Sequence, residues 1–200
     1  MSVAILVLAA YFTGAIPTSY IVGRIKGIDL RQHGSGNLGA TNAYRVLGWR
    51  AAVPVFVVDI LKGWFPTACF ALWDKSDNEL LALAYGAAAI VGHVFSIYVR
   101  FKGGKGVATS AGVLLALAPV AMLIGLVVWS ALVFMTGLVS LASIMAAAIL
   151  PVAIFALQGT GAVLWLSIGL AAFVIFAHRA NIKRLARGEE HSFRKRRQPT

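Results

Sequence analysis

The feature that most constrains the fold is a long run without charge. From Val107 to Ala177 the sequence contains no Asp, Glu, Lys, Arg or His. Hydrophobic residues make up 60% of the chain and charged residues 12%, whereas about a quarter of the residues of a soluble domain are charged. We therefore expect an all-α integral membrane protein that forms one domain over residues 1–200.

Charged residues elsewhere in the chain indicate its orientation. Basic residues gather in segments 24–50 and 100–105 and from residue 179 onward, whereas DKSDNE, residues 74–79, is acidic. Loops rich in Lys and Arg remain on the cytoplasmic side of a membrane. The pattern predicts that both glycine-rich loops and the C-terminus face the cytoplasm, with segment 74–79 and the N-terminus outside.

Three membrane spans precede the uncharged run. A helix crosses the hydrocarbon with about 20 apolar residues, and the segments that meet this requirement are 3–23, 51–73 and 80–99. The first segment has no basic n-region, so we interpret it as a span and not as a signal peptide.

The uncharged run itself crosses an even number of times, because basic residues flank both of its ends. Two crossings would use roughly 35 residues each and four crossings about 18 each, which is closer to the usual length. Helix-breaking residues lie at 118–119, 137–143 and 159–161. We therefore expect a seven-span bundle, in which segment 107–118 is short and either crosses or is re-entrant.

The segment RQHGSGNLGATNAYR, residues 31–45, contains the pattern G-x-G-x-x-G. In a dinucleotide-binding fold this pattern follows a strand and opens a helix, and an acid lies about 20 residues further on. Here a membrane helix and a basic linker precede the pattern. The candidate acid, Asp59, lies inside a span, where it can pair with Lys62 on one helix face. These features argue against a nucleotide site.

A second glycine-rich loop, FKGGKGVATS, covers residues 101–110. It does not fit a P-loop, because Lys105 is followed by glycine and no glycine lies five residues before Gly104. Glycines nevertheless let backbone N–H groups converge on an oxyanion, and a following helix start favours negative charge. Two such loops, one with Arg45 and one with Lys105, suggest phosphate binding. The alternative is a pair of interfacial turns anchored to lipid head groups.

A third polar element, AHRANIKRLARGEE, covers residues 178–190. His178 and Asn181 share one helix face there, and we favour a role for both in the site over a plain helix-end cation. We attribute the terminal RKRR, residues 194–197, to attraction by anionic lipid. His93 fits a site residue and a polar helix-packing residue equally well.

These motifs together resemble the bacterial membrane glycerol-3-phosphate acyltransferase family that uses acyl-phosphate. The resemblance covers nearly the whole chain, in order, and rests on GSGNLGATN with Arg45, GH-x-F followed by FKGGKGVAT, VSLAS, and H-R-x-N-I-x-R-L-x-x-G. Members of that family are similar in having seven spans with the motifs on the cytoplasmic side. One departure is Phe95, where the family often has proline.

The resemblance implies acyl transfer from acyl-phosphate to the 1-hydroxyl of sn-glycerol 3-phosphate, which gives lysophosphatidic acid and phosphate at the start of phospholipid synthesis. It places the protein in the bacterial inner membrane with its site facing the cytoplasm. Its partners would be the two substrates, membrane lipids and the soluble enzyme that makes acyl-phosphate, with no nucleic acid and no cofactor. The base is either His178 or the donor's own phosphate.

On this basis we expect four catalytic residues, namely His178, Lys105, Asn181 and Ser35. The substrate-binding residues that we expect are Gly34, Gly36, Asn37, Gly39, Thr41, Asn42, Arg45, Lys62, Gly103, Gly104, Gly106, Thr109, Ser143 and Glu190. We assign loop 34–42 with Lys105 to acyl-phosphate. Arg45, Lys105, Ser143, His178 and Asn181 are assigned to glycerol 3-phosphate or the reacting centre.

Other mechanisms lack the residues they need. The H-x-x-x-x-D motif of other glycerophosphate acyltransferases is absent, since no histidine here has an acid five residues later. The lone Cys69 is expected to be a buried apolar residue, and no residue spacing predicts a metal site.

A small membrane anion or phosphate transporter is the alternative function, because glycine-broken loops also suit that role.

Overall fold

A computed structural model describes residues 1–75 and 78–193. Residues 76–77 of the predicted outer loop, and the RKRR of the tail, lie outside the described residues. The described part is built from helices, as the sequence predicts, and contacts divide the chain into two units, Met1–Pro119 and Val120–Thr200. The expectation of a single domain remains a prediction.

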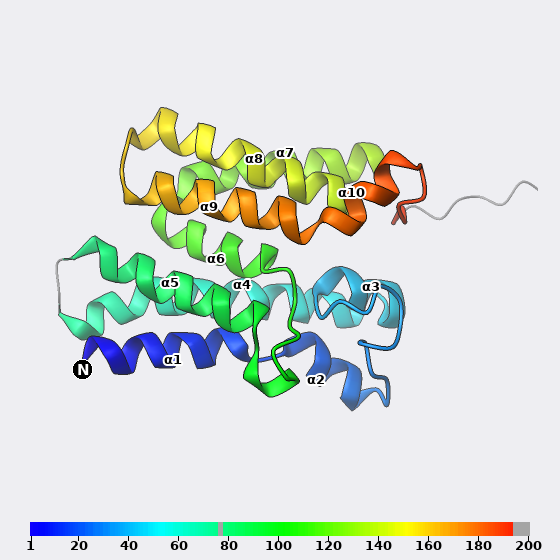
Figure 1. The fold of residues 1–200 in the computed structure, drawn as a ribbon, viewed down its shortest axis with the longest axis horizontal. Helices are drawn as coiled ribbons and strands as arrows, with labels where there is room; N and C mark the ends of the chain where they lie inside the picture. Colours follow the sequence, from blue (N-terminus) through cyan, green and yellow to red (C-terminus); the bar gives the residue numbers. More distant parts are fainter. Residues whose placement is uncertain (76–77, 194–200) are drawn as a thin grey trace, which may run out of the picture. The chain divides into compact units, whose positions relative to one another are not determined.

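The first unit contains six α-helices and a short 3₁₀ helix among its described residues (Figure 1). In order these are α1 (Val3–Ala15), α2 (Thr18–Ile25), α3 (Ala40–Leu47), α4 (Trp49–Asp74), α5 (Glu79–Val94), η1 (Ile97–Val99) and α6 (Val107–Leu117). Helix α5 packs against both α1 and α4, and α4 also packs along α6. The segment after α2, through Leu30 and Leu38, and the segment after α5, through Val99, join one apolar cluster with Val55 of α4.

The second unit contains α7 (Pro119–Thr136), α8 (Val139–Gln158), α9 (Ala162–Ala177) and α10 (Arg179–Ala186). Breaks fall at Ala118, between α6 and α7, and at 159–161, as predicted. The predicted break over 137–143 is confined to Gly137-Leu138, because α8 already begins at Val139. Gly137 and Gly159 both adopt positive φ, which ends a helix at little cost in glycine. Proline is well tolerated at the first position of α7.

Helix lengths support part of the predicted span count. Within residues 1–75 and 78–193, four helical segments are long and apolar enough to cross a membrane, or up to six if each of two bent pairs counts as one span. The bent pairs are α1 with α2, at 40°, and α9 with α10, at 58°. Helix α6 has 11 residues, which at 1.5 Å each cover about half of the roughly 30 Å hydrocarbon layer. A seventh crossing depends on α6.

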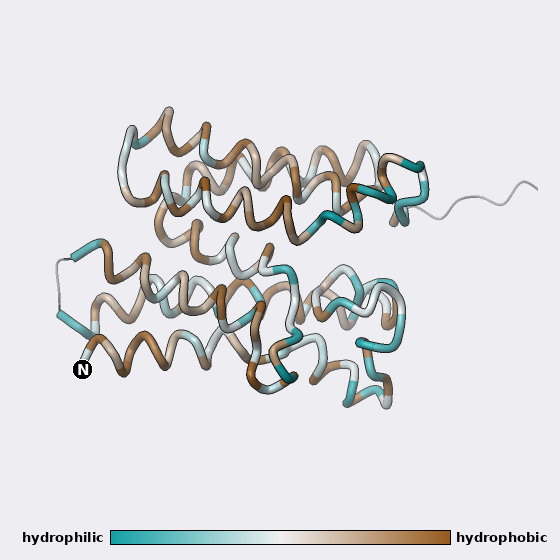
Figure 2. The backbone as a smooth tube through the Cα atoms, viewed as in Figure 1, coloured by the Kyte–Doolittle hydropathy of each residue, from teal (hydrophilic) through white to brown (hydrophobic). Residues whose placement is uncertain are grey.

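The first predicted span is not one straight helix. It breaks at Ile16 because Pro17 pushes the preceding residue toward an extended conformation, and Ile16 has ψ 114°. Figure 2 shows that hydrophilic residues gather in the segment joining α2 to α3 and along α10 with the residues after it. The first of these polar segments carries Gly34, Ser35, Gly36, Asn37 and Gly39 of the candidate site, and the second carries Asn181 and Glu190.

Close helix packing depends on small residues. A Cβ at Gly63 of α4 would overlap the carbonyl oxygen of Thr109, and a Cβ at Gly112 of α6 would overlap that of Ile60. Such reciprocal contacts are typical of membrane helices, where packing replaces the hydrophobic drive between helices. The side chain of Thr109, a predicted substrate ligand, is fully buried at this contact.

Candidate active site

The first glycine loop is built around the side chain of Asn42. The Asn42 amide donates from Nδ2 to the carbonyl oxygens of Leu30 and His33, both at 3.1 Å, and its Oδ1 accepts from the Ser35 N–H at 2.8 Å. Asn42 is 1% exposed. Its amide therefore holds the loop in shape and, within this structure, faces the loop and not solvent.

The backbone of this loop turns its N–H groups inward. The Gly36 N–H donates to His33 O and the Gly39 N–H to Asn37 O, while Asn42 takes that of Ser35. The expected convergence of loop N–H groups on an oxyanion therefore does not hold for these three donors. Gly34 and Gly36 both have positive φ, so they serve the tight turn.

Other predicted residues lie at the rim of the first loop. Ser35 and Arg45 are exposed, whereas Asn37 and Thr41 are half-buried. The loop leads into α3, whose first turn has no hydrogen bond from a capping side chain. An uncapped helix start offers N–H groups and a partial positive charge to an anion.

The second glycine loop is a close-packed segment. The Gly103 N–H donates to Val94 O at 2.9 Å and the Gly104 N–H to His93 O at 3.2 Å. A Cβ at Gly104 would overlap His93 Nε2 and lie 2.6 Å from Leu38 O. Glycine is required here because three segments of the chain converge at this point. Neither Gly103 nor Gly104 has a positive φ, so the backbone conformation alone would accept another residue.

The second loop ends where α6 begins. Gly106, at φ 78°, is the N-cap of α6 and gives no side-chain cap. Lys105, the residue before it, is half-buried. Both glycine loops thus end at a helix start that lacks a capping side chain, each with a cation close in sequence.

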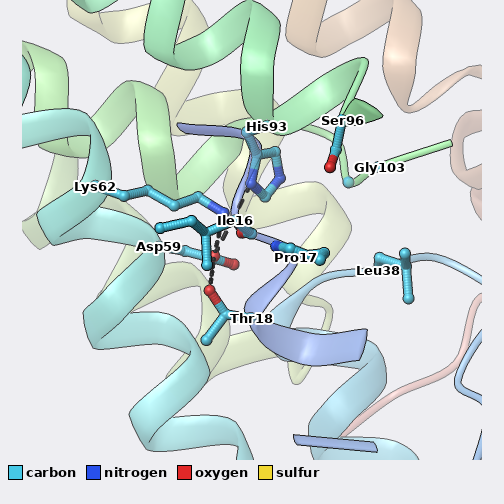
Figure 3. A pocket seen from close by; sticks show the side chains of 10 residues that line it. Ile16, Pro17, Thr18, Leu38, Asp59, Lys62, His93, Ser96 and Gly103 are labelled. Carbon is cyan, nitrogen blue, oxygen red and sulfur yellow. Dashed lines mark hydrogen bonds and ion pairs between the residues drawn. The ribbon is translucent and has the colours of Figure 1, made fainter. Parts of the chain in front are cut away.

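Next to Gly103 and Gly104 of the second loop lies a polar cluster formed by buried Asp59, Lys62 and His93 with half-buried Thr18 (Figure 3). The Lys62 Nζ lies 2.7 Å from Asp59 Oδ1, which confirms the predicted pairing. It also donates to Ile16 O at 2.8 Å, at the break after α1. Thr18 donates to Asp59 Oδ1 at 3.1 Å, so the carboxylate joins α4 to the start of α2.

His93 completes this cluster from α5. It is 6% exposed, and its Nδ1 lies 3.9 Å from Asp59 Oδ1 and has no hydrogen-bond partner among the described residues. A cavity of about 10 Å³ adjoins the cluster, roughly the volume that one water needs. Its lining includes Leu38 of the first glycine loop together with Gly103 and Gly104 of the second.

In the second unit, Glu190 organises a separate polar group. Its Oε1 accepts from Ser140 at 2.9 Å and from Asn181 Nδ2 at 2.7 Å, and its Oε2 accepts from Arg184 Nε at 2.7 Å. Burial raises the pKa of Glu190, but the hydrogen bonds from Asn181, Arg184 and Ser140 outweigh it and hold that pKa below its usual range. The carboxylate side chain is 2% exposed, so its contacts orient Asn181 and do not reach outward.

His178 lies at the bend between α9 and α10. Its Nδ1 is 2.8 Å from Val174 O, and in the neutral ring this contact places the proton on Nδ1. The Ser143 hydroxyl donates to Val139 O at 2.8 Å and accepts from the Trp129 indole at 3.2 Å. Both residues were predicted from motifs.

Sequence reasoning missed the partners of these residues. Ser140 lies 50 residues from Glu190, and Trp129 lies in a different helix from Ser143, so residue spacing did not predict either contact. Outside the spans, the Arg31 side chain hydrogen-bonds Asp29 and lowers the pKa of that carboxyl to about 2. Within residues 1–75 and 78–193, no group of three or more potential metal ligands comes together.

Comparison with known proteins supplies the remaining evidence. The family model described as glycerol-3-phosphate acyltransferase matches residues 4–188. A glycerol-3-phosphate acyltransferase of Fusobacterium nucleatum subsp. nucleatum is 44% identical over 189 residues, which cover 94% of this chain and 96% of that protein. These matches extend over both units.

Two solved structures of PlsY, an integral membrane glycerol 3-phosphate acyltransferase, share this fold. The glycerol 3-phosphate form has a TM-score of 0.91 at 39% identity and covers 97% of this chain and 96% of that chain. The lysophosphatidic acid form has a TM-score of 0.87 at 38% identity, with coverage of 96% and 95%.

Proposed function

This chain belongs to the glycerol-3-phosphate acyltransferase family, and on that premise we propose that it transfers a fatty acyl group from acyl-phosphate to the 1-hydroxyl of sn-glycerol 3-phosphate. The chain is an acyltransferase of the membrane, and its relatives are named for glycerol 3-phosphate acylation. The donor, the position acylated and the products are the proposed part. The transporter alternative fails, because the matching relatives are enzymes.

The proposed step balances simply. The 1-hydroxyl oxygen of glycerol 3-phosphate bonds to the acyl carbon, and the bond from that carbon to the phosphate oxygen breaks. The hydroxyl proton passes either to His178 Nε2 or to the leaving phosphate. The products are lysophosphatidic acid and inorganic phosphate, and a solved relative in a lysophosphatidic acid form supports this product.

Both substrates carry phosphate, so the residues' main tasks are positioning and charge neutralisation. We assign the rim of the first glycine loop and Lys105 to acyl-phosphate. Arg45, Ser143, His178 and Asn181 are assigned to glycerol 3-phosphate or the reacting carbon. The observation that supports this proposal most strongly is that both glycine loops end at uncapped helix starts near a cation.

The membrane arrangement is a further part of the proposal. We propose seven crossings, with α6 as the short one, and with the N-terminus outside. The glycine loops and the C-terminal segment then face the cytoplasm of a bacterial inner membrane, because basic residues gather there. A soluble enzyme that produces acyl-phosphate is the expected partner on that side.

The direct test combines purified protein, acyl-phosphate and labelled glycerol 3-phosphate, with lysophosphatidic acid as the measured product. We expect Lys105→Ala and Arg45→Ala each to reduce turnover by about a hundredfold or more while the protein still inserts. Lys102→Ala and Arg50→Ala are matched controls, since both residues are exposed basic neighbours of the two loops. Both controls should retain turnover.

The outcomes separate the parts of the proposal. Wild-type turnover in Lys105→Ala or Arg45→Ala would contradict the residue assignment. Product formed from acyl-CoA but not from acyl-phosphate would contradict the donor. A small loss in His178→Ala assigns the proton to the leaving phosphate, whereas a large loss with intact substrate binding assigns it to the imidazole.

A further inference from the structure

The buried Asp59–Lys62 pair contacts the chain at the places that fix the second glycine loop. Lys62 donates to Ile16 O at the break after α1. Ser96, in the turn that follows α5, donates to the neighbouring Ala15 O. Asp59 faces His93 Nδ1 at 3.9 Å and accepts from Thr18. One charged pair therefore joins α4 and the α1–α2 break, and faces α5.

His93 links the Asp59–Lys62 pair to the second glycine loop. Its backbone oxygen accepts from the Gly104 N–H at 3.2 Å, and its ring Nε2 occupies the place where a Cβ at Gly104 would lie. The other wall at Gly104 is Leu38 O of the first glycine loop. Gly104, the residue directly before Lys105, is therefore held between His93 and Leu38.

Stability alone does not account for the pair. Lys62 is 5% exposed and Asp59 is 2% exposed, inside a helix long and apolar enough to cross the membrane. Charged groups are costly in that environment, and apolar residues of similar size often replace a buried pair without loss of stability. The burial of this charged pair in a helix of membrane-spanning length therefore points to a task other than holding the fold together.

We propose that Asp59 and Lys62 are positioning residues that, through His93, set where the Gly103–Gly104 turn places Lys105. This inference rests on the proposed function, in which Lys105 contacts phosphate. It revises the expectation that Lys62 binds substrate directly, because the Lys62 ammonium contacts Asp59 and Ile16 O. The pair acts on catalysis through the loop and touches no reacting atom.

The test replaces the pair with apolar residues of similar size, as Asp59→Leu with Lys62→Met. We expect this double variant to melt near the wild-type temperature in detergent and to lose turnover by about a hundredfold, the effect of a roughly 1 Å misplacement. Amide hydrogen exchange should accelerate in peptides covering 101–106, because the Gly103 and Gly104 N–H bonds open more often. A purely structural pair would change neither the exchange nor the turnover of the folded variant.

Tyr85→Phe is the matched control. It removes the hydrogen bond from Tyr85 to Asp74, a part-buried polar contact between the same helices α4 and α5, made by the last residue of α4 and the N-terminal half of α5. We expect normal turnover and unchanged exchange at 101–106. If the apolar double variant is stable and fully active while the wild-type enzyme transfers acyl groups, the inference is overturned and the proposed function stands.

A second variant covers the case in which the double variant does not fold. Thr18→Val removes only the hydroxyl that donates to Asp59 and leaves the ion pair in place. We expect a several-fold loss of turnover with the melting temperature kept and faster exchange at 101–106. Wild-type kinetics and exchange in Thr18→Val would overturn the inference. A wild-type protein without acyl-phosphate activity would instead contradict the proposed function.

Discussion

The two glycine loops of the first unit look alike in sequence, but the glycine pairs 34/36 and 103/104 differ in why glycine is needed. Gly34 and Gly36 of the first loop have positive φ, and an Asn42 amide inside the turn holds their segment. An added Cβ at Gly34 would also overlap Asn42 Oδ1. Gly103 and Gly104 of the second loop lack that conformation and are required because His93, Val94 and Leu38 approach too closely for a Cβ. The comparison teaches that a glycine-rich motif does not by itself indicate an anion cradle.

The largest expected effect is at Gly104. Gly104→Ala should lower turnover by about a hundredfold, because the added Cβ forces the loop away from His93 and Leu38. Gly104→Asn should be worse than Gly104→Ala, since the penalty grows with side-chain size. Initial rates on both variants, in protein shown to be folded by its melting curve, measure this.

Gly161→Ala is the control for that substitution. Gly161 has an extended φ of −175° and nothing within 4 Å of an added Cβ. We expect wild-type activity and stability from it. Wild-type turnover in Gly104→Ala would show that the second loop has room, and would remove the distinction between the two loops.

A smaller effect is expected at the centre of the first loop. Asn42→Leu keeps the size of the side chain but removes three hydrogen bonds, each worth about 1 kcal/mol, so the loop should lose roughly 3 kcal/mol of stability. Hydrogen exchange in peptides covering 30–42 should rise, with turnover reduced alongside. Unchanged exchange there would mean that Asn42 does not hold the first loop.

The control for Asn42→Leu is another asparagine that bonds backbone. Asn78 accepts from the Leu80 N–H as the N-cap of α5. Asn78→Ala should cost about 1 kcal/mol of stability and leave turnover intact.

The smallest effect is expected at Gly36. There alanine should be worse than asparagine, the opposite of the order expected at Gly104. Its φ is 70°, and an added Cβ meets only Arg31 atoms, the nearest its carbonyl oxygen at 3.1 Å. Gly36→Ala should cost about 1 kcal/mol of stability, and Gly36→Asn less, because asparagine tolerates the left-handed region better. Melting temperatures of the two variants test this order. A higher melting temperature for Gly36→Ala than for Gly36→Asn would contradict a conformational role for this glycine.

Residue spacing predicted some contacts well. Asp59 and Lys62 lie three residues apart on one helix, so their pairing follows from helix geometry and was confirmed at 2.7 Å. The helix ends at Gly137 and Gly159 were similarly readable from local chemistry. The break at Ile16 was missed, because the prediction counted apolar length and gave Pro17 no weight.

Contacts between distant segments were beyond such reasoning. The partners of Glu190 include Ser140, 50 residues away, and only helix packing brings the two together. Spacing likewise cannot show whether a loop N–H points inward or outward. The Ser35, Gly36 and Gly39 N–H groups bond within the chain, and the assignment of the two loops to phosphate stays a prediction.

The amino-acid sequence by itself determined that this chain enters a membrane as helices, because an uncharged run of this length has to satisfy its backbone internally in lipid. It also indicated the helix ends near Gly137 and Gly159. Only the tertiary structure decided why each glycine is needed and which polar groups meet beneath the second loop. Those properties depend on distances of a few ångströms between segments far apart in the chain, and side-chain packing alone sets such distances.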